Sequence, residues 1–488
     1  MKRSSFKHTK PVSWMKLGSL CLIGFALGAC SMGKDYERAE LNLPESFSQA
    51  ATEAEAQTDS RWWQTLGDPA LNRFVEEAGA SNLDLRQARA RLRAATARRR
   101  SATALLLPLL NATAGNQRFK LSGNGANPVA PLANAGFASL TGEASSLGVQ
   151  ASWELDLFGR NRRAREAAIA GELATKQQLR AAALSVAAAT ANSYLQWRGL
   201  QAQRLLVEEL IAVEEQETKL IQARGRLGLA SAVEVANANA ALAIARASLP
   251  PLRSAERESA AGLGILLGKD VGSMLAELEA LDGEQRSLRL EQRVPAGLPI
   301  ELLARRSDVR AAELELVAAN AQVGSAQAAR YPNLSLTGNA GQESVDFADI
   351  FASGSRNWAF TPNLIFPVFA GGAVNAAIES ARAEREAAQA RFEQAVLTAL
   401  AEVETGLTRY AQAQLQRRAL ADAQQSAQDA VSAAGVLQEQ GLADALPVLA
   451  TRRAYLARKS ALIDSETATA QALVGLYRAL GGGWQTLL

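Results

Sequence analysis

Two carboxylates, Glu154 and Asp156, are the first candidates for chemistry in this chain of 488 residues. They occur in the stretch SLGVQASWELDLFGR, residues 146–160, in which apolar and polar residues alternate. A period of two predicts a β-strand with one apolar and one polar face, so both carboxylates lie on the polar face. Two carboxylates on one surface can serve as general acid and general base. The elements around the pair decide whether they do.

The N-terminal residues predict a lipoprotein signal peptide over residues 1–29. A basic leader without acids precedes the apolar stretch LGSLCLIGFALGAC, which is too short to span a bilayer comfortably. The stretch ends at Cys30 in LGAC, which resembles the bacterial lipobox. The resemblance implies that Cys30 carries a diacylglycerol thioether and an N-acyl chain such as palmitate. Ser31, in place of the Asp that usually retains lipoproteins at the inner membrane, implies the outer membrane.

The rest of the composition argues against an enzyme. The only histidine, His8, and one of the two cysteines, Cys21, both lie in the expected signal peptide. The chain from Cys30 onward therefore has no imidazole base and no free thiol, so we expect no catalytic residue, no metal site and no cofactor besides the lipid. A lipid-anchored hydrolase is disfavoured for the same reason. Without the leader cations the formal charge falls from +3 to about −2, which gives no reason to expect nucleic acid.

The chain repeats itself. Pro108 matches Pro332 in surroundings that agree over about thirty residues, and Gly228 matches Gly441 in the shorter stretches RLGLASAVEVANA and EQGLADALPVLAT. We therefore expect a lipidated linker over 30–66, a first repeat over 67–290 and a second over 291–488. The first repeat is expected to contain a helix, strands at about 109–120 and 145–157, a long helix at 161–225 and a return helix at 231–268. The second is expected to contain a helix at 299–330, strands at 333–341 and 357–368, a long helix at 374–440 and a return helix at 445–480.

Four amphipathic strands in a lipid-anchored chain suggest a transmembrane sheet. In lipid every backbone polar group must be paired, so such a sheet must close, and barrels begin at about eight strands. Several chains must then share one barrel, and three chains would supply twelve strands under closed cyclic symmetry. The alanine-rich long helices would pack into a tube; a simple surface coiled coil is the alternative.

Several motifs together resemble the outer-membrane efflux factor family, in its NodT-type lipoprotein branch. They are the lipobox, WELDLFGRNRRA, VPAGLPIELLARRSDVRAAE, ARYPNLSLTG, LQEQGLADALPVL and ALVGLYRALGGGW. The resemblance implies an α+β membrane channel-tunnel. In it, a homotrimer shares a 12-stranded β-barrel in the outer membrane of a Gram-negative bacterium and a long α-helical barrel in the periplasm.

The same resemblance implies a passive channel of a tripartite multidrug efflux pump, and hence antibiotic resistance. Its implied partners are a periplasmic adaptor (membrane fusion protein), an inner-membrane resistance–nodulation–division pump and outer-membrane lipid. Two alternatives remain open from the sequence: a conduit for protein secretion, and a structural lipoprotein that spans the periplasm. In the channel reading Glu154 and Asp156 are charges of the lumen or of the junction below it. Trp153 suits the membrane boundary. Arg160, Arg162, Arg163 and Arg165 form either a solvated helix start with local ion pairs or a contact with anionic lipid headgroups.

The periplasmic turns suggest caps and a gate. Ser231 with Glu234 fits a capping box, and Asp444 is the matching cap of the second repeat. In the helix that follows, Leu446, Ala450 and Arg453 share one face, which is either ordinary helix packing or a periplasmic gate. The family's stretch resembles LDAQR, whereas this chain has LATRR, with Ala450 in place of the acid. We therefore expect an apolar constriction at Leu446, with Arg453 paired to an acid on a neighbouring helix.

Overall fold

The computed structural model describes residues 31–38, 61–124, 128–281, 288–291, 294, 305–483, 485 and 487. The expected signal peptide, Cys30 and the first residues of the helix expected at 299–330 lie outside these ranges. The chain forms two compact units. The first contains the described residues of Met1–Ala39, Ala94–Leu173 and Leu314–Ala390, and the second those of Glu40–Arg93, Ala174–Glu313 and Arg391–Leu488.

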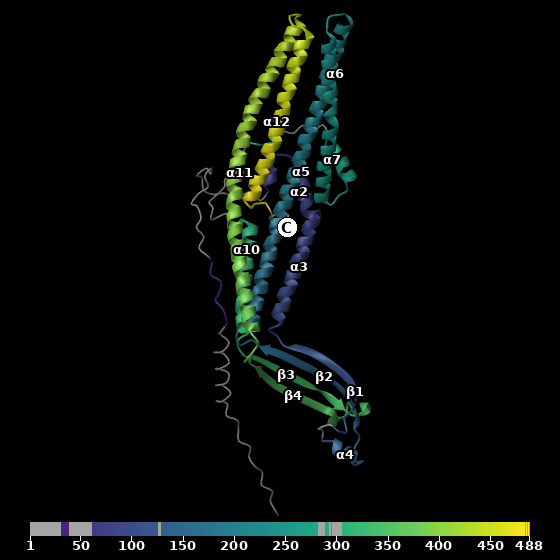
Figure 1. Ribbon diagram of the computed structural model, residues 1–488, viewed down its shortest axis with the longest axis vertical. Coiled ribbons are helices and arrows are strands. Elements are labelled where there is room, and N and C mark those ends of the chain that lie inside the picture. Colours follow the sequence, from purple (N-terminus) through teal and green to yellow (C-terminus); the bar gives the residue numbers. More distant parts are fainter. Residues whose placement is uncertain are drawn as a thin grey trace, which may run out of the picture. The chain divides into compact units, whose positions relative to one another are not determined.

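The first unit contains one antiparallel sheet whose strands follow in chain order (Figure 1). The strands are β1 (Leu109–Lys120), β2 (Thr141–Leu155), β3 (Asn333–Ser344) and β4 (Arg356–Ile365). β2 begins earlier than expected from the sequence, and β4 ends before Pro367. Pro362 lies inside β4, opposite Leu336. A proline is tolerated there because β4 is an edge strand of this sheet.

The register gives the sheet one apolar and one polar face, because residues directly opposite each other on paired strands point to the same side. The apolar face carries Leu110, Ala112 and Ala114 of β1, Leu147, Val149, Ala151, Trp153 and Leu155 of β2, Leu334, Leu336 and Ala340 of β3, and Trp358, Phe360, Pro362 and Leu364 of β4. The polar face carries Asn111 and Thr113 of β1, Ser146, Gln150, Ser152 and Glu154 of β2, Ser335, Thr337 and Asn339 of β3, and Asn357, Thr361 and Asn363 of β4. Side chains of the apolar face remain exposed in the single chain, as Trp358 does at 80%.

Two glycines let the backbones of β2 and β3 approach closely on the polar face. Gly148 lies opposite Gly341. A Cβ added at Gly341 would lie 2.7 Å from Cα of Gly148 and against the carbonyl oxygen of Leu147. Any side chain at Gly341 would therefore push the two strands apart.

A helix of 67 residues follows the second strand of each repeat. It is α5 (Arg160–Arg226) in the first repeat and α11 (Ala373–Glu439) in the second. At 1.5 Å per residue each is about 100 Å long. The shorter helices α3 (Leu83–Ala104) and α10 (Ser307–Ala328) precede the first strand of each repeat. Within the described residues, no helix is both long enough and apolar enough to cross a membrane.

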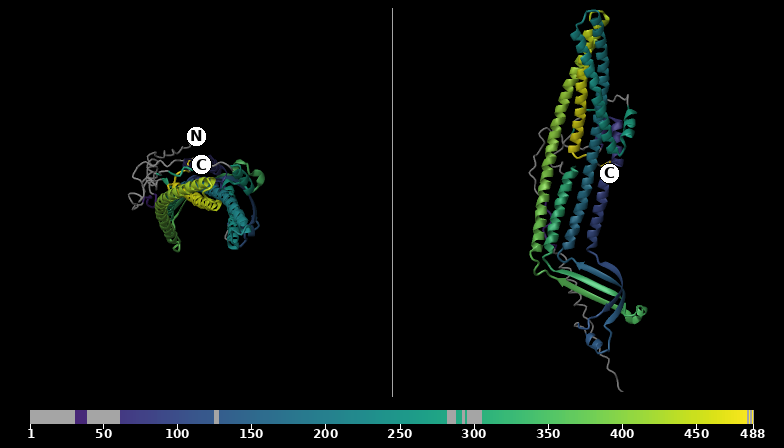
Figure 2. Two further views of the ribbon diagram at one scale, coloured as in Figure 1. Left: turned by 90° about the horizontal axis from the view of Figure 1, so that it is seen from above. Right: turned by 45° about the vertical axis from the view of Figure 1, so that its right-hand side comes forward.

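The return helices differ between the repeats. In the second unit α12 (Ala445–Ala479) is continuous and runs beside the later half of α11 (Figures 1 and 2). The single return helix expected at 231–268 is wrong, because the structure has α6 (Ala232–Ala247) and α7 (Leu249–Leu267) in its place. Pro250 and Pro251 explain the break, since proline cannot donate an intrahelical hydrogen bond but fits the first turn of a new helix.

Two further elements of the second unit were not expected from the sequence: α8 (Val271–Glu279) and a short segment before α2 (Pro69–Ser81). That segment, η1 (Trp62–Leu66), buries two indoles completely, and Trp62 stacks on Tyr477 with 5.5 Å between ring centroids. Burial of aromatic rings is the largest apolar contribution a side chain makes to a core. The core of this unit is therefore closed by residues that precede the first repeat.

Candidate functional site

The two carboxylate residues that the sequence places side by side both border the strand–helix junction, but they have different partners. Oδ2 of Asp156 accepts a hydrogen bond from the backbone N–H of Arg162 at 2.7 Å, and its side chain is 9% exposed. The Arg162 guanidinium also approaches Asp156, with Nε at 3.4 Å. A carboxylate at this position satisfies a free N–H of the first turn of α5 and interacts favourably with the helix dipole. Asp156 therefore stabilises the helix start.

Glu154 is surrounded differently. It is half-buried, it lies on the polar face opposite Ser335, and it makes no hydrogen bond or ion pair within the described part of the chain. Asp156 accepts from the first turn of α5, and Glu154 makes no contact with it among the described residues. The two carboxylates therefore do not form an acid–base pair.

Trp153 lies on the apolar face at the same end of the sheet. Its Nε1 donates a hydrogen bond to the carbonyl oxygen of Leu106 at 3.0 Å, and the residue is 37% exposed. This bond pairs the indole N–H with the backbone that enters β1. Its ring remains available to an apolar environment, as a residue at a membrane boundary requires.

One arginine of the basic helix start, Arg163, is buried, so for this residue the expected solvation is wrong and the side chain does not face lipid headgroups, whereas the expected local ion pair is present, with Glu166. Its side chain is 5% exposed. Nε donates to the carbonyl oxygen of Met32 at 3.0 Å, and Nη2 donates to that of Gly33 at 2.8 Å. Nη1 lies 2.8 Å from Asp35 and 2.7 Å from Glu166. Arg163 thus binds the segment that directly follows the expected lipid-bearing cysteine.

Backbone contacts fix the same segment, which we call the N-terminal clip (residues 31–35). The N–H of Met32 donates to the carbonyl oxygen of Phe158 at 3.1 Å. Gly33 has φ of +86°, and a Cβ there would lie 2.7 Å from Cα of Gly324 in α10. These contacts leave no room for side chains at the glycines, so the clip has one well-defined path.

The expected gate face lies in the second unit, near the start of α12. Arg453 is 40% exposed, and its Nη1 lies 3.2 Å from Oε1 of Glu214 and 3.5 Å from Oε2 of Glu217, both in α5. Arg453 was expected to pair with one acid on a neighbouring helix, and the structure shows two. The side chains of Glu214 and Glu217 are only 6% and 15% exposed. Leu446 is half-buried and Ala450 is exposed. Two further residues, Leu449 and Tyr455, pack against the buried cluster that joins α5 and α12.

The two expected helix caps differ. Ser231 and Glu234 form both hydrogen bonds of a capping box, which also lower the pKa of Glu234. Asp444 occupies the equivalent position at the start of α12 with extended backbone angles, but its side chain makes no capping hydrogen bond. The sequence match between Ser231 and Asp444 therefore predicts the position of the cap and not its bonding.

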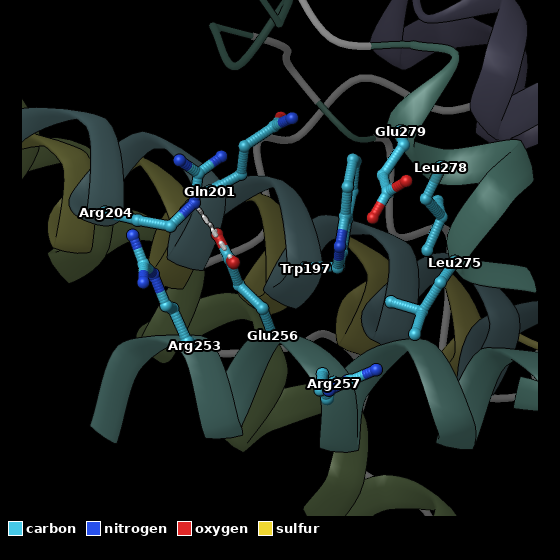
Figure 3. Close-up of a pocket in the computed structure, with 9 residues that line it drawn as sticks. All are labelled: Trp197, Gln201, Arg204, Arg253, Glu256, Arg257, Leu275, Leu278 and Glu279. Carbon is cyan, nitrogen blue, oxygen red and sulfur yellow. Dashed lines mark hydrogen bonds and ion pairs between the residues drawn. The ribbon is translucent and has the colours of Figure 1, made fainter. Parts of the chain in front are cut away.

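A hollow of about 410 Å³ lies between α5, α7 and α8 in the second unit (Figure 3). Two of its polar residues connect the helices: Nε of Arg204 in α5 donates to both carboxylate oxygens of Glu256 in α7, at 2.9 and 3.1 Å. Arg204 also pairs with Glu208. These contacts are structural, since each of the two carboxylates is already held by a guanidinium.

Comparisons with known proteins agree with this picture. Residues 74–269 and 298–482 match the family model described as outer membrane efflux protein. The chain is 33% identical over 473 residues to the toluene efflux pump outer membrane protein TtgC of Pseudomonas putida, a match that covers 96% of this chain and 95% of that protein. It is 34% identical over 469 residues to the outer membrane protein OprJ of Pseudomonas aeruginosa, with 96% and 95% covered. The solved structure of the outer-membrane channel OprN is similar with a TM-score of 0.82 at 30% identity, covering 93% of this chain and 100% of that one.

The expected fold class is confirmed, because long helices and one four-stranded sheet are combined as in the subunits of trimeric outer-membrane efflux channels. Such channels are conduits and not enzymes, so Glu154 and Asp156 need no catalytic role. The chain belongs to the outer membrane efflux protein family.

Proposed function

We propose that three copies of this chain close one 12-stranded barrel and form a passive outlet through the outer membrane. The observation that carries this proposal is the two-faced sheet. The apolar side chains run across all four strands, from the row of Leu155, Leu334 and Leu364 to the row of Ala114 and Leu147, and polar side chains such as Arg118, Glu143, Gln342 and Arg356 follow on that side at and beyond that row. The opposite side is mainly polar over the same length. In a closed barrel the first faces lipid and the second faces a water-filled lumen. The outer edges of β1 and β4 would pair between neighbouring copies, as backbone groups in lipid require.

The cargo consists of small toxic or antibiotic molecules, delivered by an inner-membrane resistance–nodulation–division pump through a periplasmic adaptor. The names of the relatives support small cargo: one is a toluene efflux pump protein and another an antibiotic efflux pump protein. Protein secretion and a purely structural tether are therefore the weaker alternatives. The test is complementation: the chain, expressed with its pump and adaptor in a strain without its own outlet, should restore resistance. No restoration by a correctly localised protein would contradict the proposal.

Cys30 carries the lipid in this proposal. The N-terminal clip supports it, because it holds Ser31 against Gly159, where the first strand pair gives way to α5. Ser31 therefore lies near the end of the sheet that this proposal puts at the periplasmic membrane surface, where two or three acyl chains would anchor a protein stably. The intact mass of the membrane-extracted protein tests this. A start at residue 30 with the mass of a diacylglycerol and an acyl chain supports it, and an unmodified Cys30 contradicts it.

Leu446, Ala450 and Arg453 form the periplasmic gate in this proposal. The ion pairs of Arg453 with Glu214 and Glu217 support it, because they hold the start of α12 against α5. Three Leu446 side chains around the axis would make an apolar constriction, and such constrictions close pores by excluding water.

A further inference from the structure

A second hollow, of about 240 Å³, lies in the first unit where β2 and β3 meet the helices. We call it the junction pocket. Its lining includes Glu154, Phe158, Tyr331, Asn333 and Ile365, together with Asp156, whose carboxylate accepts from the N–H of Arg162. Asn333 lies opposite Ile365, and their register places them on the same side of the sheet as Glu154. The junction pocket therefore opens on the polar face, which is the lumen side in the proposed channel.

Two acceptors in this pocket have no donor. Within the described part of the chain, Glu154 makes no hydrogen bond or ion pair, and Oδ1 of Asn333 is buried without a hydrogen-bond partner. Arg160 also lines the pocket, yet no guanidinium nitrogen lies within 4.0 Å of the Glu154 carboxylate among these residues. Buried polar atoms are nearly always paired, so an orphan acceptor beside a free carboxylate indicates a site for a donor.

An aromatic surface borders the same pocket. Phe158 and Tyr331 stack with 4.8 Å between ring centroids and 19° between planes. Tyr331 remains 40% exposed. An aromatic face attracts a cation through its negative quadrupole, and it also accepts the apolar part of an amphipathic molecule.

We propose that the junction pocket binds protonated organic amines as they pass through the channel. The ammonium group donates to Glu154 and to Oδ1 of Asn333, and the apolar body rests on Tyr331. The pocket is small and open, so binding is weak and reversible, as conduction requires. This inference rests on the proposed function, because it assigns a substrate class to the lumen face of the proposed channel.

The experiment uses the full-length protein purified in detergent and monodansylcadaverine, a fluorescent primary amine that is protonated at pH 7. The probe's anisotropy is titrated against protein. Glu154→Gln keeps the shape and removes the charge, and should weaken binding about fivefold, because a charge-assisted contact in a partly wet site is modest. The matched control is Glu343→Gln, which removes a carboxylate from the same face, outside the pocket. It should leave the affinity unchanged.

Two further arms make the result decisive. Tyr331→Leu should also weaken binding, and the N-acetylated probe, which has no charge, should bind wild type and Glu154→Gln equally weakly. If Glu154→Gln and Glu343→Gln lose the same amount of affinity for the probe, the attraction comes from the overall negative charge of the lumen, and the junction pocket is not the binding site. No loss in Glu154→Gln would overturn the proposed site as well. Single-channel conductance of each variant is recorded in parallel, so failure of the pocket and failure of the channel itself are distinguished.

Discussion

Arg453 of α12 holds Glu214 of α5 at 3.2 Å, and this ion pair connects the return helix of the second repeat to the long helix of the first. The carboxylate side chain is 6% exposed, whereas the guanidinium is 40% exposed. Removal of the arginine would leave a nearly buried acid, with Glu217 beside it, without its counter-charge. Loss of one partner of such a pair costs far more than loss of an exposed pair.

Arg453→Ala should therefore loosen the start of α12 and raise the basal conductance of the isolated channel. Because the partners are largely buried, we expect an effect clearly above the 0–1 kcal/mol typical of surface pairs, hence more than about a fivefold rise in open probability. Planar-bilayer recordings measure it. Arg458→Ala, an exposed residue of the same helix, is the control. Equal behaviour of the two variants would show that the ion pair does not hold the gate.

Leu446→Ser tests the apolar constriction itself. A hydroxyl in place of the isobutyl group lets water enter, so basal conductance should rise and cells should become sensitive to vancomycin, which is too large for a closed channel. Leu415→Ser, the same substitution at an exposed leucine of α11 outside this face, should change little. If the Leu446 variant assembles normally and leaves both readouts unchanged, this face is ordinary helix packing.

Arg163→Ala should release the N-terminal clip. The arginine is 5% exposed and donates to the carbonyl oxygens of Met32 and Gly33, so its loss removes the donor of two half-buried acceptors. A spin label at Ser31 should gain mobility, and limited proteolysis should cut earlier in this segment. Arg165→Ala, an exposed residue on the same helix, should change neither. An immobile label in the Arg163 variant would show that backbone contacts alone hold the clip.

Gly341→Ala should impair assembly of the sheet. The added methyl group would lie 2.7 Å from Cα of Gly148, on backbone that cannot move without separation of two strands. The control is Gly338→Ala on the same strand, where the nearest atom lies 3.8 Å from the added carbon. The fraction of protein that migrates as an oligomer in unheated electrophoresis should fall for Gly341→Ala only. Normal oligomer yield from both variants would contradict the close approach.

The carboxylate of Asp308 should make the stability of the fold depend on pH. Burial acts to raise its pKa, but the hydrogen bond and the charge of Arg306 outweigh burial, so the pKa lies below its usual value. A carboxylate with a lowered folded-state pKa stabilises the fold above its unfolded pKa of about 3.9, and this contribution is lost as the pH falls through the folded value. Asp308→Asn should thus lower the melting temperature at pH 7, and the gap from wild type should close below about pH 4. Asp84→Asn, the equivalent exposed residue of the first repeat, should show no such gap. A gap that does not narrow as the pH falls below about 4 would contradict the assignment.

The sequence predicts the elements well where the pattern is long and periodic. Both 67-residue helices and all four strands appear within a few residues of the expected ranges, because alternation in β2 and the absence of proline in α5 and α11 are strong local signals. The break between α6 and α7 was also readable, since Pro250 and Pro251 stand in the sequence. The matching helix of the second repeat, α12, is continuous and has no proline at the corresponding place, so the match between the repeats does not extend to this break.

The contacts of the site were harder to predict. That Arg163 is buried while Arg160 and Arg165 are exposed depends on the path of the N-terminal clip, which lies more than 120 residues away in the chain. The pairing of Arg453 was expected, but its partners Glu214 and Glu217 follow from the packing of α5 on α12. Long-range contacts of this kind leave no local pattern, so only the fold identifies them.

The central claim is that this chain forms a passive outlet, and single-channel recording tests it most directly. The full-length protein, purified in detergent and shown by native mass spectrometry to contain three chains, is inserted into a planar bilayer. We predict discrete conductance steps in the absence of the pump and of ATP. The steps should be small in wild type and larger in Leu446→Ser. A trimer that inserts stably and yields no conductance in either protein would contradict the account.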